Sequence, residues 1–221
     1  MIQLQSQALI LLSGGQDSAT CLAIALNECE TVEAIAFDYG QRHKIELIQA
    51  QKIADLANIK LTILDLNVLS HLSQNALTSD IPIETKAGEL PSTFVPGRNL
   101  IFLSMAAAFA YQKQIRTLYI GVCQTDYSGY PDCRQDFIDS MTRTVNLAMD
   151  TQFDIRTPLM GLTKAQTVLK MKELGKLDWY KETHTCYEGL RPACGTCPAC
   201  QLRLKGFSEA GMTDPLRYAL N

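Results

Sequence analysis

The residues best placed to do chemistry are Ser13-Gly14-Gly15-Gln16-Asp17-Ser18, because glycines and hydroxyls at this spacing can bind phosphate. This loop follows the apolar run 8–12 and precedes a stretch of helical periodicity from about residue 17 to 28. The glycines allow a tight turn, and the helix N-terminus offers unpaired N–H groups and a positive dipole. The spacing differs from a Walker loop. The alternative is a plain glycine turn with Asp17 at the helix cap. The candidate residues of this phosphate site are Leu12, Ser13, Gly14, Gly15, Gln16, Asp17, Ser18, Ala19, Thr20, Cys21 and Leu22.

Three charged residues are the candidate catalytic groups. Asp17 offers the oxygen ligands that Mg²⁺ prefers, although a carboxylate here can also simply complement the helix dipole. Lys164 follows the capping-box sequence that begins at Thr163, so it lies in a first helical turn, where a cation opposes the dipole. A compensating anion is therefore expected, and we place Lys164 on a phosphate; a solvated surface lysine is the alternative. Arg98 can pair with a substrate carboxylate or phosphate.

A substrate-binding wall is predicted where chain segments leave strand ends or enter a helix, since ligands of open parallel sheets bind outside the carboxyl ends of the strands. Asp126 or Asp132 can accept two N–H groups from a guanine-like edge, while Asp132 can equally be a helix N-cap. Tyr127 and Tyr130 can stack on a flat heterocycle or only pack. The candidate substrate-binding residues are Tyr39, Gln41, Arg42, His43, Arg98, Asn99, Asp126, Tyr127, Ser128, Tyr130 and Asp132.

Four of the eight cysteines, Cys186, Cys194, Cys197 and Cys200, lie within fifteen positions of the sequence. Four thiolates match a closed tetrahedral zinc centre, which has no open ligand position and would therefore be structural. An iron–sulfur cluster is the alternative, because closely spaced cysteine pairs suit both. The four remaining cysteines are scattered and are expected to be small apolar core residues.

The elements that position these groups alternate between strand and helix, which predicts an α/β fold with a doubly wound parallel sheet. The strands are apolar at nearly every position, as expected when both faces of a sheet are buried. Asn99 is expected to cap a helix that runs to about residue 114, residues 67–97 form a long excursion, and the pattern breaks from residue 180 into a tail rich in cysteine, glycine and proline. Strands are predicted at 8–12, 32–37, 60–66, 117–121 and 154–157, and helices at 17–28, 44–57, 99–114, 132–149 and from 163.

Composition narrows the function classes. The net charge is -3 and the pI is near 5.6, so no nucleic-acid partner is expected. The longest apolar stretch, residues 100–110, is too short to span a bilayer, and the N-terminus lacks the basic region of a signal peptide. We therefore expect no membrane association and a cytoplasmic location. The chain is divided into a nucleotide-binding domain, 1–179, and a C-terminal zinc-binding segment, 180–221, packed on it.

Together these segments resemble the QueC family of 7-cyano-7-deazaguanine synthases, within the PP-loop ATP pyrophosphatases. The matching blocks sample almost the whole chain, and the 126–132 segment with Cys-x7-Cys-x2-Cys-x2-Cys is more specific than the loop alone. One departure is at Thr183-His184-Thr185, where the family pattern has Trp-Ser before the first cysteine; a mixed Cys/His metal site is therefore also considered.

The resemblance implies an adenine nucleotide alpha hydrolase-like, Rossmann-type fold and a homodimer. It also implies that 7-carboxy-7-deazaguanine and free ammonia are converted to 7-cyano-7-deazaguanine (preQ0), for queuosine, with Mg-ATP as activator. By the same resemblance, the candidate phosphate-site residues 12–22 are expected to bind the ATP. Release of AMP and pyrophosphate is expected from the loop, while ADP and phosphate would also be compatible with activation. The nearest competing function is a PP-loop tRNA sulfur transferase, and a zinc-ribbon interaction module with a decayed nucleotide site is a further alternative.

Overall fold

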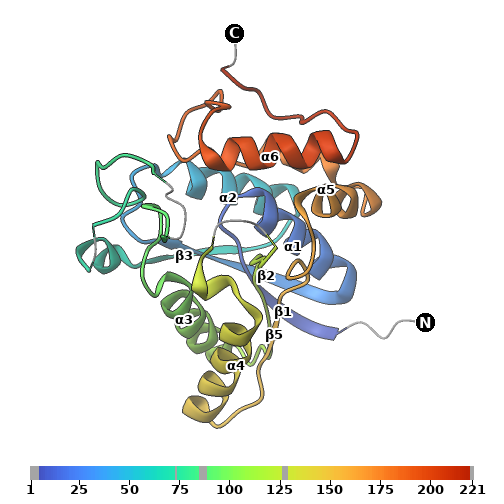
Figure 1. Ribbon diagram of the computed structural model, residues 1–221. Coiled ribbons are helices and arrows are strands. Elements are labelled where there is room, and N and C mark those ends of the chain that lie inside the picture. Colours follow the sequence, from blue (N-terminus) through green and yellow to red (C-terminus); the bar gives the residue numbers. More distant parts are fainter. Residues whose placement is uncertain (1–4, 73, 85–88, 126–128, 220–221) are drawn as a thin grey trace.

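A five-stranded parallel sheet with the strand order β3-β2-β1-β4-β5 forms the centre of the protein (Figure 1). The structure, a computed structural model, describes residues 5–72, 74–84, 89–125 and 129–219. The strands are β1 (Gln5–Leu11), β2 (Cys29–Asp38), β3 (Leu61–Asp65), β4 (Thr117–Tyr119) and β5 (Asp154–Arg156). Successive strands are added on one side of β1 up to β3 and on the other side from β4 onward. A crevice is therefore expected between the carboxyl ends of β1 and β4.

Helices cover both faces of this sheet. They are α1 (Gln16–Glu28), α2 (Ile45–Leu56), α3 (Arg98–Gln112), α4 (Gln135–Met149), α5 (Lys164–Glu173) and α6 (Pro198–Glu209), with short 3₁₀ turns η1 (Asn67–His71), η2 (Pro131–Cys133) and η3 (Leu177–Lys181). Strand β1 shows why both faces need cover: Ala8 and Ile10 pack with α1, α2 and α5, whereas Leu9 and Leu11 pack with α3 and α4. The predicted doubly wound α/β fold is confirmed.

Helix α6 lies against α5 and joins the C-terminal segment to the sheet domain (Figure 1). Gly206 allows this approach, because a Cβ there would lie 2.5 Å from the Cβ of Lys164. Phe207 belongs to the same buried cluster as α1 and α5. The sequence predicted only a tail rich in cysteine, glycine and proline from residue 180, so α6 was missed. One clustered cysteine, Cys197, is its N-cap and another, Cys200, lies in its first turn.

The prediction that Asn99 caps α3 is wrong. The N-cap is Gly97, whose φ of 71° lies in the left-handed region, and Asn99 lies inside the helix. The Asp132 carboxylate accepts from the backbone N–H of Asn99 at 3.0 Å, so the cap comes from a distant segment. Residues 132–149 are also divided, into η2 and α4, with extended backbone at Arg134.

Among the helices of the described residues, none combines the length and the apolar character needed to cross a membrane.

Candidate functional site

A cavity of about 300 Å³ opens at the carboxyl ends of β1, β2 and β4, where the strand order predicts a ligand. One end is formed by the loop between β1 and α1 together with Lys164. The other end is aromatic and contains Tyr39, Phe102, Tyr130 and Tyr187. The cavity therefore joins an anion-binding end to an end that suits a flat ring.

At the anion-binding end, the serine hydroxyls are ordered by bonds within the loop. The Ser13 hydroxyl donates to Ser18 Oγ at 3.0 Å, and the Ser18 hydroxyl donates to the Gly15 carbonyl at 3.1 Å. Gly15 is the N-cap of α1 and gives it no side-chain cap, which leaves the helix N-terminus for a ligand. Of the residues expected to bind ATP, those that line the cavity are Leu12, Ser13, Gly15, Gln16, Asp17 and Ser18.

The other expected ATP residues lie behind the loop. Ala19, Cys21 and Leu22 belong to the core that α1 buries, and the Thr20 hydroxyl is hydrogen-bonded to Tyr180. Burial raises the pKa of the Cys21 thiol well above its ordinary value, so this cysteine is an unreactive core residue. Gly14 is absent from the cavity lining but sets the shape of the loop.

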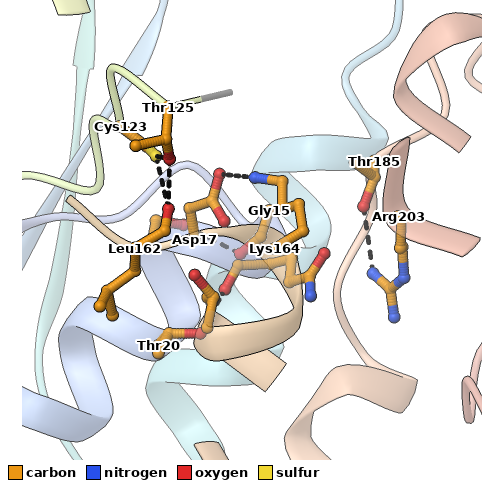
Figure 2. Close-up of polar contacts among 12 residues, drawn as sticks. Gly15, Asp17, Thr20, Cys123, Thr125, Leu162, Lys164, Thr185 and Arg203 are labelled. Carbon is orange, nitrogen blue, oxygen red and sulfur yellow. Dashed lines mark hydrogen bonds and ion pairs between the residues drawn. The ribbon is translucent and has the colours of Figure 1, made fainter. Parts of the chain in front are cut away.

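Lys164 and Asp17 meet at the same end of the cavity. The Lys164 ammonium donates to the Asp17 carboxylate at 2.5 Å, as Figure 2 shows, although the two residues are 147 positions apart. The capping box at Thr163 that places Lys164 in the first turn of α5 is confirmed. The compensating anion that we predicted is thus a protein carboxylate in this structure. The second oxygen of Asp17, Oδ1, is buried and has no hydrogen-bond partner among the described residues.

The substrate-binding predictions divide into two groups. Tyr39, Gln41, Arg98, Asn99 and Tyr130 line the cavity. Arg98 lies with its guanidinium carbon 6.0 Å from the centre of the Tyr130 ring, and Tyr130 stacks on Phe94 at 5.8 Å. A cation and aromatic faces therefore adjoin at this end, the arrangement expected for a flat anionic substrate.

The remaining candidates do not line the cavity. Arg42 pairs with Asp80 at 3.3 Å, and His43 packs against Gly189, where a Cβ would lie 2.1 Å from the imidazole Cγ. Asp132 is occupied in capping α3. Asp126, Tyr127 and Ser128 lie outside the described residues.

Among the cavity residues that sequence reasoning missed, Glu46 and Tyr187 carry polar groups that could contact a ligand. Burial raises the pKa of the Glu46 carboxyl from 4.5 to about 7, while the positive charge of Arg98 acts in the opposite direction. The local sequence does not mark Glu46 as a site residue, because acidic residues are common in the first turn of a helix, where they complement the helix dipole. Tyr187 directly follows Cys186, so no local pattern separates it from the cysteine-rich segment.

The four clustered cysteines come together as predicted, because their Sγ atoms all lie within 4.8 Å of one another. This donor set fits a metal held by four thiolates. His184 lies beside it, with Nε2 at 2.9 Å from the Cys186 carbonyl oxygen. Among the described residues, the ligand group comprises the four cysteines without a histidine.

A buried arginine connects the cysteine segment to the anion-binding loop. Arg203 of α6 pairs through two nitrogens with Asp214, at 2.7 and 2.9 Å. A third nitrogen donates to the hydroxyl of Thr183 at 2.6 Å and to that of Thr185 at 3.0 Å. Figure 2 shows the contact with Thr185. Between these threonines the backbone N–H of His184 donates to the Gly14 carbonyl at 2.8 Å. The C-terminal segment thus holds the loop in place.

Gly14 provides a test of this loop geometry. Its φ is +82°, and a Cβ there would lie 2.2 Å from the Glu46 carbonyl oxygen and 2.8 Å from the Ala50 nitrogen. We expect Gly14→Ala to lower the free energy of unfolding by about 2–4 kcal/mol, from left-handed strain and overpacking, and to raise the KM for ATP. Urea denaturation and steady-state kinetics measure both.

Gly161→Ala is the matched control, because no atom lies within 4 Å of a Cβ at that position. We expect its unfolding free energy to stay within about 0.5 kcal/mol of wild type. Equal stabilities of the two variants would show that the loop does not need a glycine at position 14.

Fold and site together define a class: a parallel α/β nucleotide-binding domain whose SGGQDS loop and helix N-terminus form an anion site, with a four-cysteine segment attached. The chain resembles the crystal structure of a 4-thiouridine synthetase–RNA complex with bound ATP, with a TM-score of 0.54 and 17% identity over 93% of this chain and 50% of that one. This likeness supports the fold.

Two curated relatives are much closer in sequence. A 7-cyano-7-deazaguanine synthase of Bacillus subtilis (strain 168) is 54% identical over 208 residues, which are 93% of this chain and 95% of that protein. A 7-cyano-7-deazaguanine synthase of Chromobacterium violaceum is 50% identical over 217 residues, 95% of this chain and 92% of that protein. The profile of the queuosine biosynthesis protein QueC matches residues 7–211. The chain belongs to the QueC family.

Proposed function

We propose that this enzyme converts 7-carboxy-7-deazaguanine and ammonia to 7-cyano-7-deazaguanine at the expense of ATP. The single observation that carries the proposal is the cavity, which joins the SGGQDS loop, Asp17 and Lys164 to an aromatic end with Arg98. The names of the two close relatives support the product. They do not favour the tRNA sulfur transferase alternative, and the acidic net charge of -3 agrees with them.

The proposed reaction begins with activation of a poor electrophile. A carboxylate oxygen of the substrate attacks the α-phosphorus of ATP, and pyrophosphate leaves into the loop between β1 and α1. The N-terminus of α1 and the ammonium of Lys164 stabilise the charge on the departing group without reorganising during the reaction. Arg98 holds the substrate carboxylate at the start of this step.

The acyl-adenylate then reacts with ammonia. The nitrogen forms a C–N bond, AMP leaves, and loss of a proton gives the amide. A second ATP activates the amide oxygen in the same way, and elimination of AMP and a proton gives the nitrile. We propose one site for both halves, because acid and amide differ by one small group and the described residues line a single continuous cavity around the loop.

We propose that the protein binds two metal ions, one at the reaction site and one with a structural role. The unpartnered Oδ1 of Asp17 fits a Mg²⁺ ion, which would neutralise phosphate charge when bound. The four thiolates of Cys186, Cys194, Cys197 and Cys200 would hold a structural zinc ion. We further propose a cytoplasmic homodimer, on the family resemblance.

The test is mass spectrometry of the purified protein with 7-carboxy-7-deazaguanine, Mg-ATP and ¹⁵N-ammonium. A nitrile that contains ¹⁵N, formed together with AMP, is the expected result. ADP in place of AMP would keep the overall conversion and overturn the adenylation. A protein that consumes no ATP and forms neither amide nor nitrile would refute the proposed function.

Removal of the cysteine-bound metal is expected to destabilise the protein. A structural zinc ion contributes on the order of 10 kcal/mol to folding in small metal domains, so we expect Cys197→Ser to lower the Tm by about 10 °C or more. The KM for ATP should rise, because the 183–185 segment contacts the loop through His184. Differential scanning fluorimetry and elemental analysis measure both stability and metal content.

Cys29→Ser is the control, since Cys29 lies outside the cluster and its thiol contacts the Tyr119 hydroxyl. It should keep one zinc ion per chain. Iron with visible absorption in the wild-type protein would contradict zinc, and full metal retention by Cys197→Ser would contradict the four-thiolate site.

A further inference from the structure

The Glu46 carboxylate is a half-buried acceptor that lines the cavity and that the reaction scheme does not use. It enters the cavity from the first turn of α2. The backbone of Glu46 is held close to the loop between β1 and α1. A Cβ added to Gly14 would overlap the Glu46 carbonyl oxygen. Within the described residues no hydrogen bond or ion pair reaches its oxygens, and Arg98 acts on it only through its charge.

A ligand that fills the cavity would cover this carboxylate further, and the contact is favourable only if the ligand supplies hydrogen-bond donors to its oxygens. Its neighbours indicate which part of a ligand arrives. Tyr39 and Tyr187 lie near enough for the Glu46 charge to raise their pKa values. The backbone of Glu46 therefore contacts the loop, while its carboxylate lies near the aromatic residues of the cavity.

We infer that Glu46 determines specificity by accepting hydrogen bonds from the pyrimidinone edge of the substrate's deazaguanine ring. This inference rests on the proposed function. The edge carries a ring N–H and a 2-amino group side by side, and a carboxylate has two oxygens that can accept both. The substrate's own carboxyl group is excluded from this contact by charge repulsion. It is thereby directed to the other end, where ATP is activated.

Among the described residues, the other acidic candidates are less suitable for this role. Asp17 lies at the anion-binding end and already accepts from Lys164, and one oxygen of Asp132 caps α3. Among the described residues that line the cavity, Asp17 and Glu46 are the carboxylates. Arg98 supports the assignment, because its positive charge favours the ionised form of Glu46 that accepts two N–H groups.

The test compares two substrates in one variant. Wild type and Glu46→Gln are assayed with 7-carboxy-7-deazaguanine and with its analogue that lacks the 2-amino group. Glutamine keeps the size of the side chain but replaces one acceptor by a donor that faces the substrate's own donors. We expect kcat/KM for the amino substrate to fall about 10- to 100-fold, and kcat/KM for the analogue to change less than about threefold.

Several outcomes would overturn the inference. An equal fall with both substrates would indicate a different role, such as accepting a proton from ammonium. If the ratio of kcat/KM for the two substrates is the same in Glu46→Gln as in wild type, Glu46 does not recognise this edge. Because the ionised carboxylate is disfavoured by burial, Glu46→Gln is expected to fold as stably as wild type, which urea denaturation checks.

Asp55→Asn, an exposed change near the end of the same helix, serves as the control and should leave kcat/KM for both substrates unchanged. Failure of the proposed function is distinguishable, because wild type would then convert neither substrate.

Discussion

Lys164→Met is expected to lower kcat/KM for ATP by about 10²–10³-fold. The ammonium lies at the anion-binding end of the cavity, is nearly buried, and is paired with Asp17. Its removal takes away the cation that we propose to stabilise the departing pyrophosphate, and it leaves the Asp17 carboxylate without this counter-ion. Methionine keeps the length of the apolar stem, so the packing of Gly206 against Lys164 is disturbed little. The measurement is steady-state kinetics with pyrophosphate release as the readout.

The control for this prediction is Lys170→Met, on the same helix but exposed and paired only with Glu173 in the described contacts. It should change kcat/KM less than about twofold. A Lys164→Met enzyme with wild-type kinetics would remove this residue from catalysis.

A double-mutant cycle separates two roles of Lys164. If its ammonium acts on the phosphates directly, the double variant loses more activity than Asp17→Asn alone. If Lys164 only holds Asp17 in position, the double variant loses no more than Asp17→Asn alone. We expect a loss greater than that of either single variant but smaller than their sum, because both residues line the cavity and their direct contact couples them.

The parts of this site that the sequence predicted are those encoded by short-range spacing. The anion loop, the capping box at Thr163 and the four-cysteine cluster each depend on residues a few positions apart, and the structure contains all three. The strand and helix pattern likewise predicted the parallel sheet, since buried strands read as apolar runs.

The parts that could not be predicted depend on contacts between distant segments. Asp132 caps α3 from 33 positions away, so the local sequence favoured Asn99, which offers the right side chain at the wrong place. Lys164 pairs with Asp17, which is 147 positions away in the sequence. The local sequence indicated only that a lysine in a first helical turn needs an anion, not which anion. Glu46 becomes distinctive only when folding encloses it beside Arg98.

Long-range contact also explains the second large effect that we expect, in Arg203→Met. Arg203 is fully buried, and its guanidinium donates to Asp214, Thr183, Thr185 and the carbonyl oxygen of Tyr180. Loss of one partner leaves the Asp214 carboxylate buried and uncompensated, which typically costs about 3–5 kcal/mol. The free energy of unfolding should fall by that amount.

Urea denaturation followed by the fluorescence of Trp179, the single tryptophan of the chain, measures this change close to its origin, because Trp179 precedes Tyr180 in η3. Lys205→Met, an exposed change on the same helix, should alter stability by less than about 0.5 kcal/mol. Equal stabilities of the two variants would contradict the role of the buried ion pair.

The consequence for function distinguishes Arg203 from an ordinary core residue. Its bonds to Thr183 and Thr185 fix the segment from which His184 donates to the Gly14 carbonyl. A combined Arg203→Met, Asp214→Leu variant removes both buried charges and is expected to regain part of the lost stability, as replaced buried ion pairs commonly do. Its KM for ATP should nevertheless stay raised, because the threonine contacts are still missing. A double variant that regains both stability and a wild-type KM would show that the contacts of Arg203 stabilise the fold without positioning the loop.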